Sequence, residues 1–277
     1  MIYSEPGETC PWLFIVHDAG WYIRDVSWQY VSRAKGYFML IKACLNGWRG
    51  RGEHPSIPLT PAELANAARD AVEAGAGALH MHPRNAHGVQ SLAAEDVAAA
   101  ITAVRAACPG MPVGGTTIAT IEPDVARRVA LLRGWTVLPD FVSVNFSEQG
   151  VAEVCDILLQ KGVGIEAGLA NADDVRLLLA LGLAERFVRI MFEPEEQIVA
   201  DALENVRAME VLLDAAHVPT PRLLHGVECT AWLLLDVAIQ RGYDTRIGFE
   251  DTLLMPDGSL AESNAVLVAA AWERARR

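Results

Sequence analysis

The feature that most constrains the fold is an eightfold alternation of short apolar runs with longer amphipathic stretches after residue 39. The apolar runs have the length of strands, and the stretches between them have helical length and periodicity. Runs that are apolar on both faces and separated by helices are typical of a parallel sheet. The predicted strands are LIKACLN (40–46), GALHMH (77–82), MPVGGTT (111–117), DFVSVNF (140–146), GVGIEA (162–167), RFVRIMF (186–192), PRLLHGV (221–227) and DTRIGFE (244–250).

The first amphipathic stretch has a clear helix start. Thr60 is the expected N-cap, Pro61 occupies the first turn, and Glu63 completes a capping box, while Gly75 ends the helix. The eight predicted helices span 61–75, 93–107, 123–133, 150–161, 172–182, 196–215, 228–241 and 262–276.

Eight strand–helix units in about 240 residues predict an α/β fold, a (β/α)8 TIM barrel that forms a single domain over residues 39–277. The alternative is a doubly wound open sheet. That alternative is disfavoured because no GxGxxG motif follows the first strand.

Residues 1–38 differ from the rest of the chain. They hold four of the five tyrosines and three of the seven tryptophans, without a clear period. The segment is either an ordered N-terminal extension or sequence upstream of a natural start at Met39. We favour the start at Met39 and expect no catalytic role for this segment.

Charge and cysteine pattern exclude several classes of function. The net charge of −12 argues against a nucleic acid or an anionic membrane as the main partner. No apolar run reaches the ~18–20 residues of a membrane span, and no secretory signal is evident at the N-terminus. The five cysteines are scattered, which favours free thiols and a cytoplasmic protein.

Polar residues gather where the predicted strands end, which is where barrel enzymes place their active sites. Buried without partners, such residues would each cost several kcal/mol, so their grouping is more easily explained by a site than by chance. They are Asn46, His80, His82, Thr116, Thr117, Ser143, Asn145, Glu166, Glu193, His225, Arg246, Glu250 and Asp251.

His80 and His82 are two residues apart in a strand and therefore project from the same face. Leu79 and Met81 suit the face toward the helices, so the histidines are expected to point into the barrel. Two imidazoles and a carboxylate can hold one metal ion with a coordination position left open, and Glu250 is the best candidate carboxylate. The alternative is a pair of ordinary histidines satisfied by hydrogen bonds.

The segment RIGFED carries a second cluster. Arg246 can keep Asp251 ionised and oriented or bind a substrate carboxylate; alternatively it makes a structural ion pair at a strand end. Glu166 is a second acid–base group, a hydrogen-bond acceptor for a polar substrate group, or a solvated residue at the end of its strand. His225 could line the pocket, but we interpret it as a hydrogen-bonded core histidine.

These residues resemble the beta-keto acid cleavage enzyme family, whose founding activity is 3-keto-5-aminohexanoate cleavage. The most specific segments are HPSIPLTPAEL (54–64), AGAGALHMHPRNAHG (74–88) and RIGFED (246–251). The resemblance runs from about Leu40 to Asp251 and into the last helix. Two departures stand out: Asn85 replaces the usual Asp, and the sequence after the last helix is shorter than usual, which bears on oligomer contacts and on the CoA site.

The resemblance implies a barrel fold, a divalent metal (usually Zn²⁺) and acetyl-CoA as co-substrate, in a homo-oligomer. It implies His80, His82 and Glu250 as metal ligands, and Arg246 and Asp251 as a dyad in which Asp251 is the base. Glu166 would be a substrate-pocket glutamate that we group with the catalytic residues. We assign Asn46, Thr116, Thr117, Ser143 and Asn145 to substrate binding.

The implied reaction condenses a beta-keto acid with acetyl-CoA to give acetoacetate and a new acyl-CoA. One alternative is a zinc-dependent TIM-barrel hydrolase, in which the histidine pair activates water. A second is a non-catalytic barrel that binds a metabolite or a metal.

Overall fold

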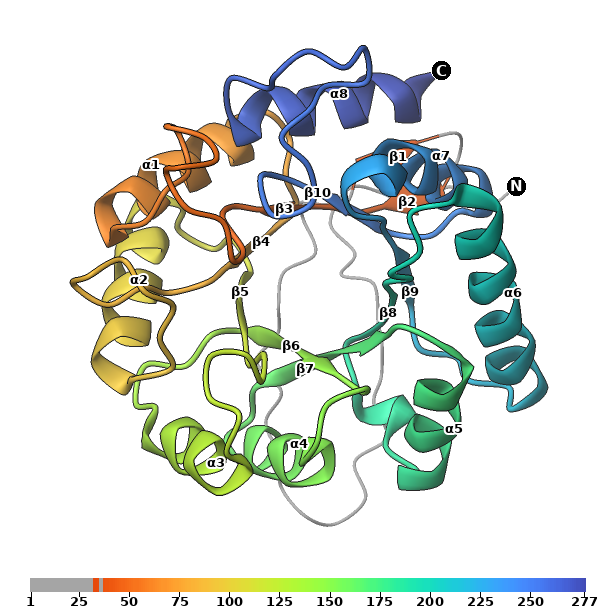
Figure 1. Ribbon diagram of the computed structural model, residues 1–277, viewed down its shortest axis with the longest axis horizontal. Coiled ribbons are helices and arrows are strands. Elements are labelled where there is room, and N and C mark those ends of the chain that lie inside the picture. The colour runs from red at the N-terminus through yellow and green to blue at the C-terminus, as the bar shows by residue number, and fades with distance from the viewer. Residues whose placement is uncertain (1–31, 35–36) are drawn as a thin grey trace, which may run out of the picture.

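Eight parallel strands form the centre of the computed structural model, which describes residues 32–34 and 37–277 (Figure 1). Their order around the sheet is β10-β3-β4-β5-β6-β7-β8-β9. The edge strands β9 and β10 meet through the parallel bridge Leu223–Asp244, which nearly closes the barrel. The strands are β3 Ile41–Cys44, β4 Ala78–Met81, β5 Val113–Thr116, β6 Phe141–Asn145, β7 Gly164–Leu169, β8 Arg189–Phe192, β9 Arg222–Leu224 and β10 Thr245–Ile247.

Eight helices surround the strands (Figure 1). They are α1 Pro61–Glu73, α2 Ala94–Ala107, α3 Val125–Gly134, α4 Val151–Gln160, α5 Ala172–Leu181, α6 Val199–Ala215, α7 Ala231–Arg241 and α8 Asn264–Arg276. The predicted (β/α)8 barrel is therefore confirmed, with each predicted strand and helix present. The helix predicted to begin at residue 228 starts three residues later, after the short 3-10 helix η2 Glu228–Thr230.

The predicted start of the first helix is also confirmed. Thr60 Oγ1 accepts a hydrogen bond from the Glu63 amide at 3.3 Å, and a Glu63 carboxylate oxygen accepts one from the Thr60 amide at 3.0 Å. Such a cap contributes about 1 kcal/mol to helix stability.

Alternation along the strands sorts the side chains between two environments. Leu79 and Met81 are fully buried in the apolar core between strands and helices. The residues between and after them, His80 and His82, take the opposite face and lie inside the barrel. The same alternation brings Lys42 of β3 into the barrel interior, where it is fully buried.

Two short strands, β1 Ser32–Ala34 and β2 Tyr37–Met39, form an antiparallel pair that precedes the barrel. The predictions for residues 1–38 fall mainly outside the described residues. Within the described part of the chain, Cys44, Cys108, Cys155 and Cys229 are free thiols. None of the described helices is long and apolar enough to cross a membrane.

Candidate active site

Three buried side chains converge at the carboxyl ends of β4 and β10. His80 Nε2 lies 3.5 Å from Glu250 Oε2, and His82 Nε2 lies 3.7 Å from Glu250 Oε1. One potential ligand atom from each residue lies within 4.8 Å of the others. Ligand atoms that share one ion at ~2.0–2.2 Å are themselves about 3–4 Å apart, so the spacing suits a bound metal.

Three polar atoms of this triad lack a hydrogen-bond partner in the described part of the chain. Both ring nitrogens of His80 and Glu250 Oε2 are buried without a hydrogen bond among the described residues. Leaving such atoms unsatisfied costs about 1–3 kcal/mol each, and a cation coordinated by His80 Nε2 and Glu250 Oε2 would remove that cost for these two atoms. Burial lowers the pKa of His80 to about 3, so its imidazole is neutral and has a lone pair to give to a metal.

His82 is held in a metal-binding orientation by two residues behind it. Its Nδ1 lies 2.5 Å from Gln90 Oε1, and because that oxygen only accepts, the proton resides on Nδ1 and Nε2 faces Glu250 with a free lone pair. Asn46 Oδ1 accepts from the His82 amide at 2.9 Å, and Asn46 Nδ2 donates to the His82 carbonyl at 3.0 Å.

The contacts of Asn46 differ from the predicted role in substrate binding. Its second Nδ2 hydrogen donates to the Pro58 carbonyl at 3.0 Å, and its side chain is fully buried. Both donors are therefore occupied by backbone, and Asn46 fixes the strand that carries His82.

Gly47 makes room for the Glu250 carboxylate. Its φ is +54°, and a Cβ there would overlap the Glu250 side chain. The next close approach is at Gly248, where a Cβ would overlap the Cys44 carbonyl oxygen. These two glycines let the turn after β10 pack directly on the end of β3.

Arg246 joins the triad to the second carboxylate. Arg246 Nη2 donates to Glu250 Oε1 at 2.8 Å and to Asp251 Oδ1 at 2.6 Å. The Arg246 Nε donates to the same Asp251 oxygen at 2.9 Å. Asp251 Oδ2 is buried and has no partner in the described part of the chain. The dyad therefore presents one carboxylate oxygen that is free to accept a proton.

The electrostatics favour ionised carboxylates here. Burial alone would raise the pKa of Asp251, but Arg246 and then His225 lower it below its ordinary value. Burial would raise the pKa of Glu250 as well, but the same cation outweighs it and holds the pKa well below its usual range. Both groups are therefore anions at neutral pH, as a metal ligand and a general base must be.

The prediction that Glu166 closes its strand is wrong. The strand β7 continues to Leu169, and Glu166 is fully buried in its middle. One of its oxygens pairs with Lys42 and the other accepts from Arg189 at 2.5 Å. These cations overcome burial and lower its pKa to about 2. Since Glu166 is fully buried and charged at neutral pH, it is better suited to holding the barrel together than to acid–base chemistry.

The remaining predicted substrate residues lie on β5 and β6, except for Thr117, which directly follows β5. Thr117 is occupied, because its hydroxyl donates to the Ser143 carbonyl at 2.8 Å. Thr116 and Ser143 are neighbours across the β5–β6 ladder, and both are buried near the strand ends. Asn145 Nδ2 lies 3.4 Å from Glu148 Oε1, a contact long enough to leave the amide available to a ligand.

The Asn85 side chain closes the turn that follows β4. Its Oδ1 accepts from the amides of His87 and Val89 at 2.9 and 3.1 Å, which closes the turn after β4. Arg84 precedes the same turn, and its Nη2 donates to the carbonyls of Gly47 and Arg49 at 2.6 and 2.8 Å. The loop that follows His82 is thus hydrogen-bonded to the loop at Gly47, which packs against Glu250.

Two residues of the site region have little signal in the sequence. Gln90 lies eight residues after His82, opposite Arg84 in an isolated bridge, where nothing in the sequence marks it as a partner of that ring. Lys42 could have been noticed as a lone lysine inside an apolar strand, LIKACLN, although its anionic partner on β7 is 124 residues away.

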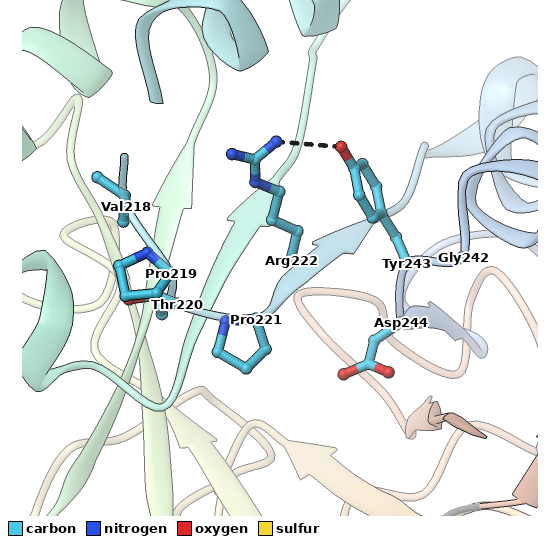
Figure 2. A pocket seen from close by; sticks show the side chains of 8 residues that line it. All are labelled: Val218, Pro219, Thr220, Pro221, Arg222, Gly242, Tyr243 and Asp244. Atoms are coloured by element: carbon cyan, nitrogen blue, oxygen red, sulfur yellow. Dashed lines mark hydrogen bonds between the residues drawn. The ribbon is translucent and has the colours of Figure 1, made fainter. Parts of the chain in front are cut away.

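A separate pocket of about 360 Å³ lies at the other end of the barrel, before β9 and β10 (Figure 2). Its polar groups are already partnered. Arg222 donates to the Tyr243 hydroxyl at 3.2 Å, and Asp244 accepts from the Leu40 amide and from Arg189, both at 2.9 Å. This pocket contains none of the candidate site residues.

Comparison with known proteins gives a consistent picture. A family model described as beta-keto acid cleavage enzyme matches residues 39–277. The 3-keto-5-aminohexanoate cleavage enzyme of Fusobacterium nucleatum subsp. nucleatum is 27% identical over 245 residues, which cover 83% of this chain and 88% of that protein. The enzyme of the same name from Acetoanaerobium sticklandii is 22% identical over 243 residues, covering 83% and 89%.

Among solved structures, the fold is similar to ObcA, described as a ternary complex with a C4-CoA adduct and oxalate. The TM-score is 0.64 at 16% sequence identity, and the match covers 79% of this chain. The chain spans 63% of the ObcA chain, so this likeness supports the barrel fold alone.

Proposed function

The chain belongs to the beta-keto acid cleavage enzyme family, and on that premise we propose that it condenses a beta-keto acid with acetyl-CoA. The products would be acetoacetate and a new acyl-CoA. The observation that carries this proposal is the juxtaposition of a metal-ligand triad with a carboxylate that has one free oxygen, both held by Arg246.

The triad fits a divalent metal, and we propose Zn²⁺ held by His80, His82 and Glu250. A neutral histidine set with one carboxylate and an open position is the donor set of a catalytic zinc site. When bound, such an ion supplies Lewis-acid polarisation of the 3-keto oxygen, which acidifies the C2 protons.

Asp251 would act as the base. Its free Oδ2 takes a proton from C2, while Arg246 keeps the carboxylate ionised and oriented through Oδ1. The C2 carbanion attacks the thioester carbon of acetyl-CoA, and the CoA thiolate leaves. That thiolate then attacks C3, the C2–C3 bond breaks, and the released carbanion takes up a proton to give acetoacetate.

We propose that the substrate carboxylate binds at the ends of β5 and β6. Thr116 and Ser143 offer hydroxyls near the strand ends, and Asn145 offers an amide. The Thr116 hydroxyl accepts from the Ile118 amide at 3.2 Å, which leaves its hydrogen to donate to a carboxylate. We further propose that residues 39–277 form the catalytic unit of a cytoplasmic homo-oligomer.

The test is incubation of the metal-loaded protein with a panel of beta-keto acids and acetyl-CoA, followed by mass spectrometry. New acyl-CoA species together with acetoacetate are the expected result. Consumption of a substrate without acetyl-CoA would favour the hydrolase alternative. Absence of turnover with every member of the panel, despite bound metal, would favour a non-catalytic binding barrel.

A further inference from the structure

His225 is a buried histidine that the proposed reaction does not use. It follows β9 directly and is 3% exposed. Its sequence context favours an ordinary core histidine, but its neighbours are charged side chains of the candidate site.

Each ring nitrogen of His225 faces a different carboxylate. Nδ1 lies 3.5 Å from Asp251 Oδ1, and Nε2 lies 3.4 Å from Glu193 Oε2. Nδ1 is buried and has no hydrogen-bond partner in the described residues, so Asp251 Oδ1 is the carboxylate oxygen placed to receive it. The ring thus bridges the fully buried Asp251 and the Glu193 carboxylate, whose side chain is 20% exposed.

Glu193 is itself placed by a glycine. Its Oε1 lies over Gly168 of β7, where a Cβ would overlap that oxygen. The Glu193 amide also donates to the Leu169 carbonyl at 3.0 Å. Glu193 is therefore anchored on β7 and β8 while its other oxygen faces His225.

We propose that His225, held by Glu193, is a positioning residue for the Asp251 carboxylate. This inference rests on the proposed function, in which Asp251 Oδ2 is the atom that accepts the proton. Arg246 of β10 and His225, the residue directly after β9, approach the same oxygen, Oδ1.

The need for a second contact follows from the geometry of Arg246. Its Nη2 donates to both Asp251 and Glu250, so the hydrogen bond to Asp251 depends on the position of Glu250, the proposed metal ligand. A contact from β9 fixes the rotation of the Asp251 carboxylate independently of Glu250. The backbone supports the same junction, since the Glu228 amide donates to the Asp251 carbonyl at 2.7 Å.

The kinetic test compares two replacements of His225. In His225→Asn the amide nitrogen stands close to Nδ1 and can still meet Asp251, whereas in His225→Gln it stands close to Nε2 and meets Glu193 instead. We expect kcat to fall about 100-fold in His225→Gln, with KM within about threefold, and to recover most of its value in His225→Asn. Glu193→Gln should lower kcat about tenfold, because the ring loses its anchor.

The control is His217→Asn, an exposed histidine with a φ of +54° that Asn tolerates. It should leave kcat and KM unchanged. Equal kcat in His225→Asn and His225→Gln, or a loss expressed only in KM, would overturn the positioning role. Denaturant unfolding of each variant separates these effects from a general loss of stability.

A second measurement needs no substrate. In protein labelled with ¹⁵N-histidine, the Nδ1 resonance of His225 should shift in Asp251→Asn and its Nε2 resonance in Glu193→Gln, while His217→Asn changes neither. Unchanged His225 resonances in both carboxylate variants would overturn the inference whatever the activity. If these shifts occur but no beta-keto acid is turned over, the proposed function fails while the placement of Asp251 by His225 stands.

Discussion

Arg246 holds Asp251 by a single oxygen. Two guanidinium nitrogens, Nε and Nη2, lie 2.9 and 2.6 Å from Asp251 Oδ1. Asp251 Oδ2 is buried without a partner among the described residues. The same Nη2 donates to Glu250 Oε1 at 2.8 Å. One arginine thus contacts both the proposed metal ligand, Glu250, and the proposed base, Asp251, and these two roles can be separated by experiment.

Glu250→Gln and Asp251→Asn should differ in kind. Glu250→Gln removes the anionic ligand, so metal affinity should fall by more than about 100-fold, since changes outside the ligand set already cost 10–100-fold. Asp251→Asn should keep the metal and lower kcat about 10²–10⁴-fold, because the base is lost. Metal content after dialysis and steady-state kinetics check both. Equal metal occupancy in the two variants would contradict this division of roles.

Gln90→Leu should weaken metal binding without touching a ligand. The variant loses the acceptor that holds the proton on His82 Nδ1, so metal affinity should fall about 10–100-fold. A competition titration with a chelating dye measures this change. Gln160→Leu, at an exposed position on α4, is the matched control. Equal affinities in the two variants would show that the Gln90 contact does not orient the ring.

Gly47→Ala should displace Glu250. The added methyl group overlaps the Glu250 side chain, and the φ of +54° is unfavourable for Ala by about 1–2 kcal/mol. Gly258→Ala is the control, because its φ is +84° but a Cβ there meets open space. Both variants should lose stability in denaturant unfolding, while only Gly47→Ala should lose metal affinity. A Gly47→Ala protein that binds metal normally would show that Gly47 is not needed to place Glu250.

Glu166→Gln should destabilise the barrel strongly. It leaves Lys42 fully buried beside a neutral amide, and breaking a buried pair in this way costs about 3–5 kcal/mol. Adding Lys42→Met should recover part of that loss, since no uncompensated charge then remains at the position. Urea unfolding of the two single variants and the double variant measures the coupling. Additive losses would mean that the pair contributes nothing as a pair.

The same pair should make stability depend on pH in a defined window. The pKa of Glu166 is lowered from its ordinary value of 4.5 to about 2 in the folded protein. A lowered folded pKa adds stability above the unfolded value, so this contribution should be present above pH 4.5 and be lost as the pH falls toward 2. The Lys42→Met/Glu166→Gln double variant should show a shallower loss of unfolding free energy across that window. Identical slopes would exclude this source.

The sequence by itself determined the barrel and most of the site. Eight apolar runs and eight amphipathic stretches specify the elements, because backbone hydrogen bonding and burial act locally along the chain. The two-residue spacing of His80 and His82 placed both rings inside the barrel, since side chains alternate along a strand. RIGFED supplied Arg246 and both carboxylates, of which Glu250 lies beside the two rings.

Only the tertiary structure decided which partners the polar residues of the candidate site have. Asn46 and Glu166 were predicted to face the substrate, but one is bonded to the backbone around His82 and the other is enclosed by Lys42 and Arg189. Gln90, Glu193 and His225 gain their partners from turns or other strands. The physical reason is that strand alternation fixes the face a side chain takes, whereas its partner depends on the register between strands that are distant in sequence.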